Sequence, residues 1–251
     1  MIELEGIFRR GGRGPELSDI DLIVPGGVAV AVVGATGAGK SHLAAIAAAR
    51  AEPDAGRVWF FGRDARKLRA SSRARLRRQI GFIPQNPQFF EDERVLANVG
   101  LPLALEGAPT VEVNEAARAA LCAVELSGAA LARVRDLSGG ERRRAALARA
   151  LVGKPQIIVA DDPIAGLDLD SATRTLSALE QARADGAAVL IASAEPRLVS
   201  AARYLSWELF ELGDGCLAAL APRRTREQTD PGDVTPKNVV PFPAQRAAGG
   251  S

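Results

Sequence analysis

The hydrophobic residues of the chain follow two spacings, one typical of β-strands and the other typical of helices. An unbroken apolar run at 28–33 predicts a buried strand, and the Ala-rich run at 43–51 behind it predicts a helix. The same criteria, with Gly and Pro as boundaries, place the other elements. Further strands are expected at 2–8, 20–24, 58–61, 79–85, 156–160, 187–193, 205–212 and 216–220, and further helices at 63–78, 95–105, 113–126, 142–152 and 171–184.

The order of these elements predicts an α/β fold, because buried strands alternate with helices on either side of a purely helical stretch. Residues 2–8 and 20–24 predict an antiparallel hairpin, whereas residues 86–136 contain few β-branched residues. We therefore expect one domain over residues 1–221, with an antiparallel β subdomain and an inserted helical subdomain at about 86–145. The Pro-, Arg- and Gly-rich tail at 222–251 has no hydrophobic period and is predicted to be disordered.

A glycine-rich segment joins the first buried strand to the first helix and matches G-x-x-x-x-G-K-[ST]. It reads Gly34, Ala35, Thr36, Gly37, Ala38, Gly39, Lys40 and Ser41. Glycines let the backbone turn its N–H groups inward, and the helix N-terminus adds positive potential. Lys40 is placed to reach the outer phosphates of a nucleotide, and Ser41 is placed to hold Mg²⁺. The segment predicts a site for a nucleoside triphosphate.

Polar residues at the ends of two other predicted elements extend this site. Asp161 and Asp162 follow an apolar strand, and the carboxyl ends of such strands form the ligand-binding edge of open α/β sheets. Gln85 stands where the strand predicted at 79–85 stops. Ser138 precedes Gly139, Gly140, Glu141 and a helix, so it is a candidate N-cap, and the free N–H groups there form a second candidate anion site. Paired acids indicate metal binding and proton handling.

Composition narrows the functional classes further. The 251 residues include a single histidine, His42, which excludes any mechanism that needs a histidine elsewhere. Cys122 and Cys216 lie far apart in sequence and are expected to be small buried hydrophobic residues. The chain shows neither a long apolar run nor a signal-peptide pattern, so a cytoplasmic location is expected.

Charge is concentrated in one stretch, since the net charge is +2 but residues 63–78 hold eight basic residues and one acid. A solvated helical face explains such a stretch most simply. Nucleic acid is not expected, because no aromatic residue interleaves with the arginines. Contact with anionic lipid is a third alternative.

These motifs, in this order, resemble those of the ABC (ATP-binding cassette) ATPase family, whose members bind ATP with Mg²⁺. Within the family, Leu-Arg-Arg-Gln-Ile-Gly at 76–81 and Ala-Asn-Val-Gly-Leu-Pro-Leu at 97–103 look most similar to the FtsE-type cell-division ATPases. That resemblance implies an FtsX-like integral membrane partner and a position at the inner face of the cell membrane. The lipoprotein-release and MacB-like export ATPases share much of this sequence and are the alternative to the FtsE-type assignment.

The resemblance also implies roles for single residues. Residues 34–41 would bind the phosphates, and Ser41, Gln85 and Asp161 would coordinate Mg²⁺ directly or through water. Ser138, Gly139, Gly140 and Glu141 would cap the γ-phosphate held by a second subunit in a head-to-tail homodimer, or in a heterodimer with an intact paralogue. Asp168 would lie at that dimer seam. Gln85, Phe89, Phe90 and Leu96 would lie beside a groove for a helix of the membrane partner.

Several positions depart from the family pattern, among them Arg142 and Arg143 in place of the usual glutamine, and four of them bear on hydrolysis or on nucleotide binding. Asp162 replaces the expected catalytic glutamate, and Ala194 stands where a histidine is expected. Gly11 falls near the position of an aromatic residue that stacks on adenine. His42 replaces a threonine, where it either donates to the α-phosphate or faces solvent. Hydrolysis is therefore expected to be slow or lost, unless Asp162 suffices as the base in an exporter. A scaffold without nucleotide binding is a further alternative, against which the presence of Lys40 and Ser41 argues.

Overall fold

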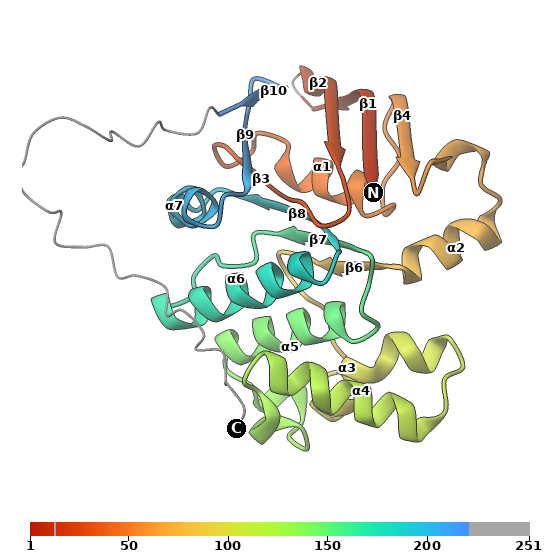
Figure 1. Cartoon of the computed structure of the whole chain (residues 1–251), viewed down its shortest axis with the longest axis vertical. Helices are drawn as coiled ribbons and strands as arrows, with labels where there is room; N and C mark the ends of the chain where they lie inside the picture. The colour runs from red at the N-terminus through yellow and green to blue at the C-terminus, as the bar shows by residue number, and fades with distance from the viewer. Residues whose placement is uncertain (13, 221–251) are drawn as a thin grey trace, which may run out of the picture. The chain divides into compact units, whose positions relative to one another are not determined.

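The computed structural model describes residues 1–12 and 14–220, and the predicted tail at 222–251 lies outside them. In Figure 1, a mostly parallel sheet lies between an antiparallel sheet and a group of helices, which confirms the α/β fold expected from the order of the elements. The strands are β1 Ile2–Gly11, β2 Gly14–Val24, β3 Ala29–Val33, β4 Ala55–Phe60, β5 Arg63–Asp64, β6 Ile80–Ile83, β7 Ile157–Asp161, β8 Ala188–Ser193, β9 Glu208–Gly213 and β10 Cys216–Ala219. The α-helices are α1 Lys40–Ala47, α2 Ala70–Arg78, α3 Val95–Leu105, α4 Thr110–Ala123, α5 Gly139–Leu151, α6 Leu169–Ala184 and α7 Pro196–Tyr204.

The larger sheet brings the functional segments to one edge. Its strand order is β10-β9-β3-β8-β7-β6, and β9, β3, β8, β7 and β6 run parallel. Every residue of β3, β7 and β8 is buried, which is why these strands read as continuous apolar runs. Val33 pairs with Ser193, and Asp161 pairs with Ala192. The ends of these three strands therefore lie side by side, immediately before the segments predicted to bind nucleotide.

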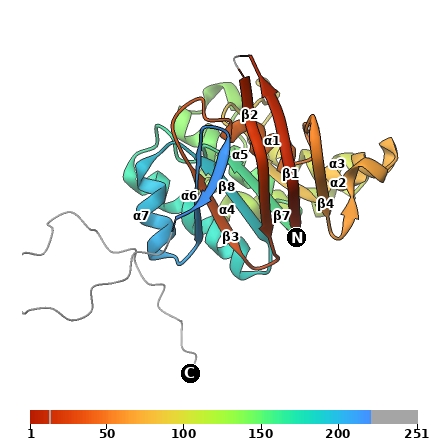
Figure 2. The same cartoon turned by 90° about the horizontal axis from the view of Figure 1, so that it is seen from above.

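The smaller, antiparallel sheet has the order β2-β1-β4-β5 and packs into the same core as β3 and α1. Figure 2 shows β1, β2 and β4 side by side. The first hairpin is longer than the hydrophobic pattern predicts, because β1 and β2 continue into the Gly-rich stretch. Register shifts interrupt their pairing between Leu4 and Arg10, and both Gly6 and Asp19 adopt positive φ. Such bulges disturb the simple alternation from which the strand ends were predicted.

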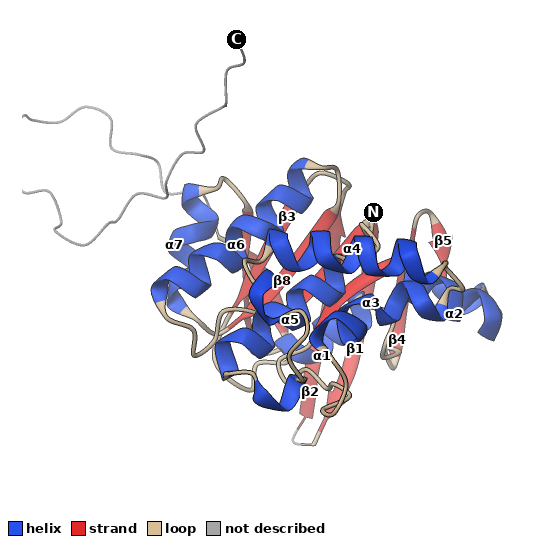
Figure 3. Cartoon of the chain, turned by 90° about the horizontal axis from the view of Figure 1, so that it is seen from below, coloured by secondary structure: helices blue, strands red, loops and turns tan. Residues whose placement is uncertain are grey.

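The helical subdomain is formed by α3 and α4, which pack against α5 (Figure 3). Helix α3 has the predicted ends, and α4 begins three residues before its predicted start at 113. The two helices approach closely at Gly100, where a Cβ atom would lie 2.6 Å from Cγ1 of Val113. Among the described residues, no helix is both long and apolar enough to cross a membrane.

Two predictions about local structure are wrong, and one helix was missed. Only Ala70–Arg78 of the basic stretch is α-helical, because the buried Asp64 accepts a hydrogen bond from Arg66 N and starts a separate 3₁₀ turn. Helix α7 was not predicted, although Pro196 at its first turn is a helix-start signal. Cys122 and Cys216 are exposed rather than buried.

Glu180 links α6 to the start of β9 and supports a prediction about stability. Its carboxylate accepts hydrogen bonds from Trp207 Nε1 at 2.6 Å and from Arg183 at 2.7 and 2.8 Å. The hydrogen bond from Arg183, followed by that from Trp207, lowers the pKa of Glu180 despite its burial. The ionised carboxylate is therefore the form that stabilises the fold.

We expect Glu180→Gln to lower the free energy of unfolding by about 1–2 kcal/mol at pH 7. A lowered folded-state pKa stabilises above the unfolded value of about 4.3, and this contribution is lost as pH falls through the folded value. The difference between variant and wild type should therefore shrink below about pH 4. Urea denaturation from pH 3 to pH 8 measures it, with the exposed Glu115→Gln as control. A constant difference over this range would contradict the assignment.

Candidate functional site

The glycine-rich loop connects β3 to α1 and requires glycine at particular positions. A Cβ atom on Gly34 would lie 2.2 Å from the carbonyl oxygen of Leu212 in β9, so only glycine fits there. Gly39 is the residue before α1 and adopts φ 96°, in the left-handed region that favours glycine. The loop is therefore held between the central sheet and the N-terminus of α1.

Lys40 is the first residue of α1, and its side chain folds back into the loop. Its Nζ donates to the carbonyl oxygens of Gly34 at 2.9 Å and of Ala35 at 2.7 Å, and the residue is only 7% exposed. Burial lowers the pKa of Lys40, while the nearby charges of Asp162 and Asp161 oppose this shift. The loop thus encloses a cation where the sequence places the outer phosphates.

Ser41 and Asp161 form the centre of the predicted metal site. Ser41 Oγ donates to Asp161 Oδ1 at 3.1 Å, and Asp161 is 8% exposed. Burial raises the pKa of Asp161, with a smaller contribution from the charge of Asp162. A buried carboxylate beside a hydroxyl is a donor set that suits Mg²⁺, which prefers oxygen ligands and keeps several waters. In the described part of the chain, no group of three or more His, Cys, Asp and Glu residues is arranged to hold a metal ion.

Asp162 adopts φ 53°, and its carboxylate is tied to neighbouring segments. Oδ1 accepts hydrogen bonds from Ser193 Oγ and from Ala194 N at 3.3 Å, and Oδ2 accepts one from Gln85 Nε2 at 3.3 Å. The structure therefore brings Gln85, Asp162 and Ala194 together, while their catalytic roles stay a prediction. Ser193 was missed, because no sequence signal shows that its buried hydroxyl points at Asp162.

A cavity of about 10 Å³ lies between Gln85, Asp162 and Arg143. This volume is at the lower limit for one water molecule, and the lining supplies polar groups from Gln85, Asp162 and Arg143. Arg143 also donates from Nη1 to the carbonyl oxygen of Asp162 at 3.4 Å. The surroundings of Asp162 are thus compact as well as polar.

His42 is held by a partner that the sequence did not reveal. Its Nδ1 lies 2.5 Å from Glu16 Oε1, although Glu16 belongs to β2, and the His42 side chain is 44% exposed. The helix start is therefore tied to the antiparallel sheet. His42 thus partly faces solvent, which was one of the two predicted alternatives. The other, donation to an α-phosphate, stays a prediction.

The segment Ser138–Glu141 forms a complete capping box at the start of α5, which confirms Ser138 as an N-cap. Ser138 N and Ser138 Oγ donate to Glu141 Oε2 at 2.9 and 2.7 Å, and these hydrogen bonds lower the pKa of Glu141. Ser138 and Gly139 are exposed. The helix N-terminus is thus accessible to a second molecule, and its role toward a γ-phosphate stays a prediction.

Asp168 caps α6 in a similar way. Its carboxylate accepts hydrogen bonds from Ser171 N at 2.8 Å and from Ser171 Oγ at 2.7 Å, which lower the pKa of Asp168. Arg144 on α5 donates to the same hydroxyl at 3.2 Å, so Ser171 links the two helices. This geometry gives Asp168 a structural function, and its predicted place at a dimer seam is not tested by it.

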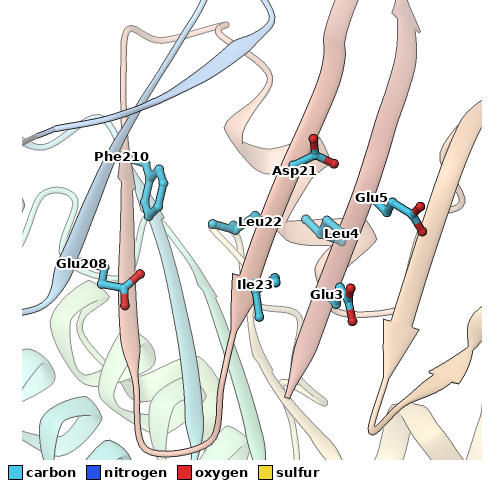
Figure 4. Close-up of a pocket in the computed structure, with 8 residues that line it drawn as sticks. All are labelled: Glu3, Leu4, Glu5, Asp21, Leu22, Ile23, Glu208 and Phe210. Atoms are coloured by element: carbon cyan, nitrogen blue, oxygen red, sulfur yellow. The ribbon is translucent and has the colours of Figure 1, made fainter.

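A larger cleft of about 460 Å³ lies away from the glycine-rich loop, between β1, β2 and β9 (Figure 4). Its lining contains four carboxylates, which would repel a triphosphate. The nucleotide is therefore not expected to bind there. The lining residues are Glu3, Leu4, Glu5, Asp21, Leu22, Ile23, Glu208 and Phe210.

Comparison with known families decides which site this is. The family model of the ABC transporter matches residues 17–165, a range that contains the glycine-rich loop, the capping box and both aspartates. The chain belongs to the ABC transporter family. It is an ATP-binding cassette, and the resemblance found in the sequence is confirmed.

Individual relatives include both predicted branches of the ABC family. The chain is 35% identical over 201 residues to the cell division ATP-binding protein FtsE of Haemophilus influenzae, covering 79% of this chain and 92% of the relative. FtsE of Escherichia coli K12 is 34% identical over 219 residues, with 86% and 97% covered. The macrolide export ATP-binding/permease protein MacB 1/2 of Paracoccus denitrificans is 35% identical over 238 residues. That match covers 92% of this chain but only 35% of MacB 1/2, so the chain spans about a third of that relative.

Solved structures of ABC cassettes resemble the fold closely. A dimeric post-hydrolysis state of the ATP-binding cassette MJ0796, bound to ADP and Pi, superimposes with a TM-score of 0.81 at 27% identity, covering 89% of this chain and all of the other. A second dimeric structure of MJ0796, described as a bacterial ABC transporter cassette, gives 0.79 at 28% identity, covering 86% and 96%. The ABC fold thus extends over most of the chain.

Proposed function

We propose that this ABC cassette is the ATP-binding subunit of an FtsE–FtsX-like complex in bacterial cell division, and that it hydrolyses ATP slowly or not at all. It would act at the inner face of the cell membrane, as a head-to-tail dimer joined to an FtsX-like membrane protein. Residues 1–221 would form the nucleotide-binding domain, with the helical subdomain at about 86–145. The FtsE relatives match nearly over their whole length, which supports the cell-division branch.

The observation that carries slow hydrolysis is the state of Asp162. A general base must reach the proton that it removes, within about 2.6–3.2 Å or through one water. The short Asp162 side chain instead accepts hydrogen bonds from Ser193, Ala194 and Gln85. Ala194 contributes its backbone N–H but has no imidazole that could orient a phosphate and a water. The general base at position 162 is therefore short and already hydrogen-bonded, and the histidine expected at position 194 is missing.

The groups needed to bind the phosphates and Mg²⁺ are complete in comparison. Lys40 lies inside the loop and is placed to contact the outer phosphates, while the N-terminus of α1 directs N–H groups toward them. Ser41, Asp161 and Gln85 would hold Mg²⁺, which when bound offsets the negative charge of the phosphates. In the dimer, Ser138 and Gly139 would face the γ-phosphate bound by the other subunit. Such a protein would stay in its ATP-bound state for a long time, because hydrolysis is slow.

The test is whether ATP alone gives a lasting dimer. We expect the unmodified chain, mixed with Mg²⁺ and ATP, to elute as a dimer in size-exclusion chromatography and to keep unhydrolysed ATP through the run. A dimer that lasts only with a non-hydrolysable analogue, together with rapid release of phosphate, would contradict slow hydrolysis.

Gly139→Glu is the matched interface variant. A Cβ atom at Gly139 meets nothing within 4 Å, so the substitution fits the folded chain. Its carboxylate would repel the γ-phosphate of the facing subunit. We expect Gly139→Glu to bind ATP as a monomer, and an undiminished ATP-dependent dimer would exclude the proposed seam.

A working exporter ATPase of the MacB-like or lipoprotein-release kind is the second candidate, favoured by the 35% identity to MacB 1/2 over 92% of this chain. Co-purification from the native membrane separates the two, because the first candidate requires an FtsX-like protein and the second a transporter permease. A scaffold that binds no nucleotide is least compatible with the buried Lys40. Calorimetry with ATP tests that alternative directly.

A further inference from the structure

The segment before β6 forms a strongly basic surface that the proposed function does not use. Six arginines and one lysine of this segment are exposed, and we call them the basic surface. They are Arg63, Arg66, Lys67, Arg69, Arg75, Arg77 and Arg78. Within residues 1–12 and 14–220, Arg66 alone of these seven forms an ion pair, with Asp64 at 3.2 Å. The positive charge of the basic surface is therefore largely uncompensated.

Helix α2 carries part of this surface and gains little from packing. Leu76 is its only buried residue, and the helix contains no acidic residue. Arg73, which is half-buried, pairs with Glu52, but Arg75, Arg77 and Arg78 crowd the last turn. Cations there interact favourably with the helix dipole, yet they also repel one another. An external anionic surface would relieve this repulsion.

The C-terminal end of α2 leads directly into β6, and β6 ends two residues before Gln85, which is expected beside the groove for a helix of the membrane partner. Arg50 lies 5.0 Å above the ring of Phe82, and Arg149 lies 4.3 Å above the ring of Phe89. Burial, and to a smaller extent the charge of Arg77, lowers the pKa of Arg50, so these two cations repel each other. Figure 1 shows α2 beside β6, at the margin of the sheet. A cassette docked through this groove would thus hold the basic surface close to its membrane.

We propose that the basic surface binds the anionic headgroups of phospholipids beside the membrane partner. The orientation toward the membrane rests on the proposed function, whereas the affinity for anionic lipid does not. Each basic residue near an anionic membrane surface adds to the attraction, and the attraction weakens with salt. Nucleic acid is the weaker alternative, because no aromatic residue occurs between Arg63 and Arg78 to stack on bases.

The test is sedimentation of the full chain with lipid vesicles. We expect binding to vesicles of phosphatidylglycerol and phosphatidylcholine at low salt, weaker binding as salt rises, and none to phosphatidylcholine alone. The double variant Arg75→Glu, Arg78→Glu removes two exposed cations and adds two anions, so its partition coefficient should fall at least about tenfold. The control Arg118→Glu, Arg203→Glu makes the same charge change at exposed positions of α4 and α7, and should bind within about twofold of wild type.

Calorimetry with ATP separates this proposal from the proposed function, since both double variants should bind ATP as wild type does. Loss of vesicle binding with ATP binding retained supports the basic surface as a lipid site. Equal binding to neutral vesicles, or an equal fall in the control, would overturn it. Tighter binding to duplex or single-stranded DNA than to anionic vesicles would assign the surface to nucleic acid instead.

Discussion

The double variant Asp162→Glu, Ala194→His is expected to hydrolyse ATP at least about 100-fold faster than the unmodified chain. General base catalysis contributes about 10²–10⁴-fold, and a misplacement of about 1 Å can cost about 100-fold. The longer glutamate would extend past the hydrogen bonds that hold Asp162, and the histidine would supply an imidazole beside it. Ala194 is partly exposed, so the fold has room for the larger side chain. Release of phosphate over time measures the change.

The matched control is Asp136→Glu, Ala119→His, which makes the same substitutions at exposed positions. It should hydrolyse ATP at the wild-type rate. Because Asp162 adopts φ 53°, where a glutamate is less favourable than an aspartate, thermal unfolding should confirm that the active-site variant is folded. If the unmodified chain already hydrolyses ATP as fast as the folded double variant, the proposal that Asp162 and Ala194 slow hydrolysis is wrong.

Replacement of Lys40 by alanine is expected to lower the affinity for ATP at least about 100-fold. The ammonium group is enclosed by the loop, where a charge-assisted hydrogen bond to phosphate is far less screened than at the surface. Isothermal titration calorimetry with Mg²⁺ and ATP measures this affinity. The exposed Lys67→Ala serves as control and should leave it unchanged. An affinity within about threefold of wild type in folded Lys40→Ala would show that nucleotide does not bind at this loop.

Much of the fold could be predicted because the central strands are short, apolar and bounded by Gly or Pro. The site residues could also be placed, since each motif follows directly from a strand end or helix start. Side-chain contacts between distant segments could not be predicted. The pairs His42–Glu16 and Ser193–Asp162 join residues 26 and 31 positions apart, and no local pattern encodes them.

The errors have a similar origin. Helix α7 is short and lies between two predicted strands. Its few apolar residues, Leu198, Ala201 and Ala202, were therefore not recognised as the buried face of a helix. The basic stretch was treated as one helix because charge alone does not mark a boundary. The boundary is set instead by Asp64, whose side chain turns the chain before α2 begins. Local hydrogen bonding overrides composition in this case.

The pairing of His42 with Glu16 gives the molecule an internal reporter. With a single imidazole in 251 residues, the aromatic proton resonances of histidine in an NMR spectrum arise from one known place, next to the phosphate-binding loop. Nucleotide entry, loop rearrangement and subunit association can each be followed through that signal, without isotope-based assignment or an added label.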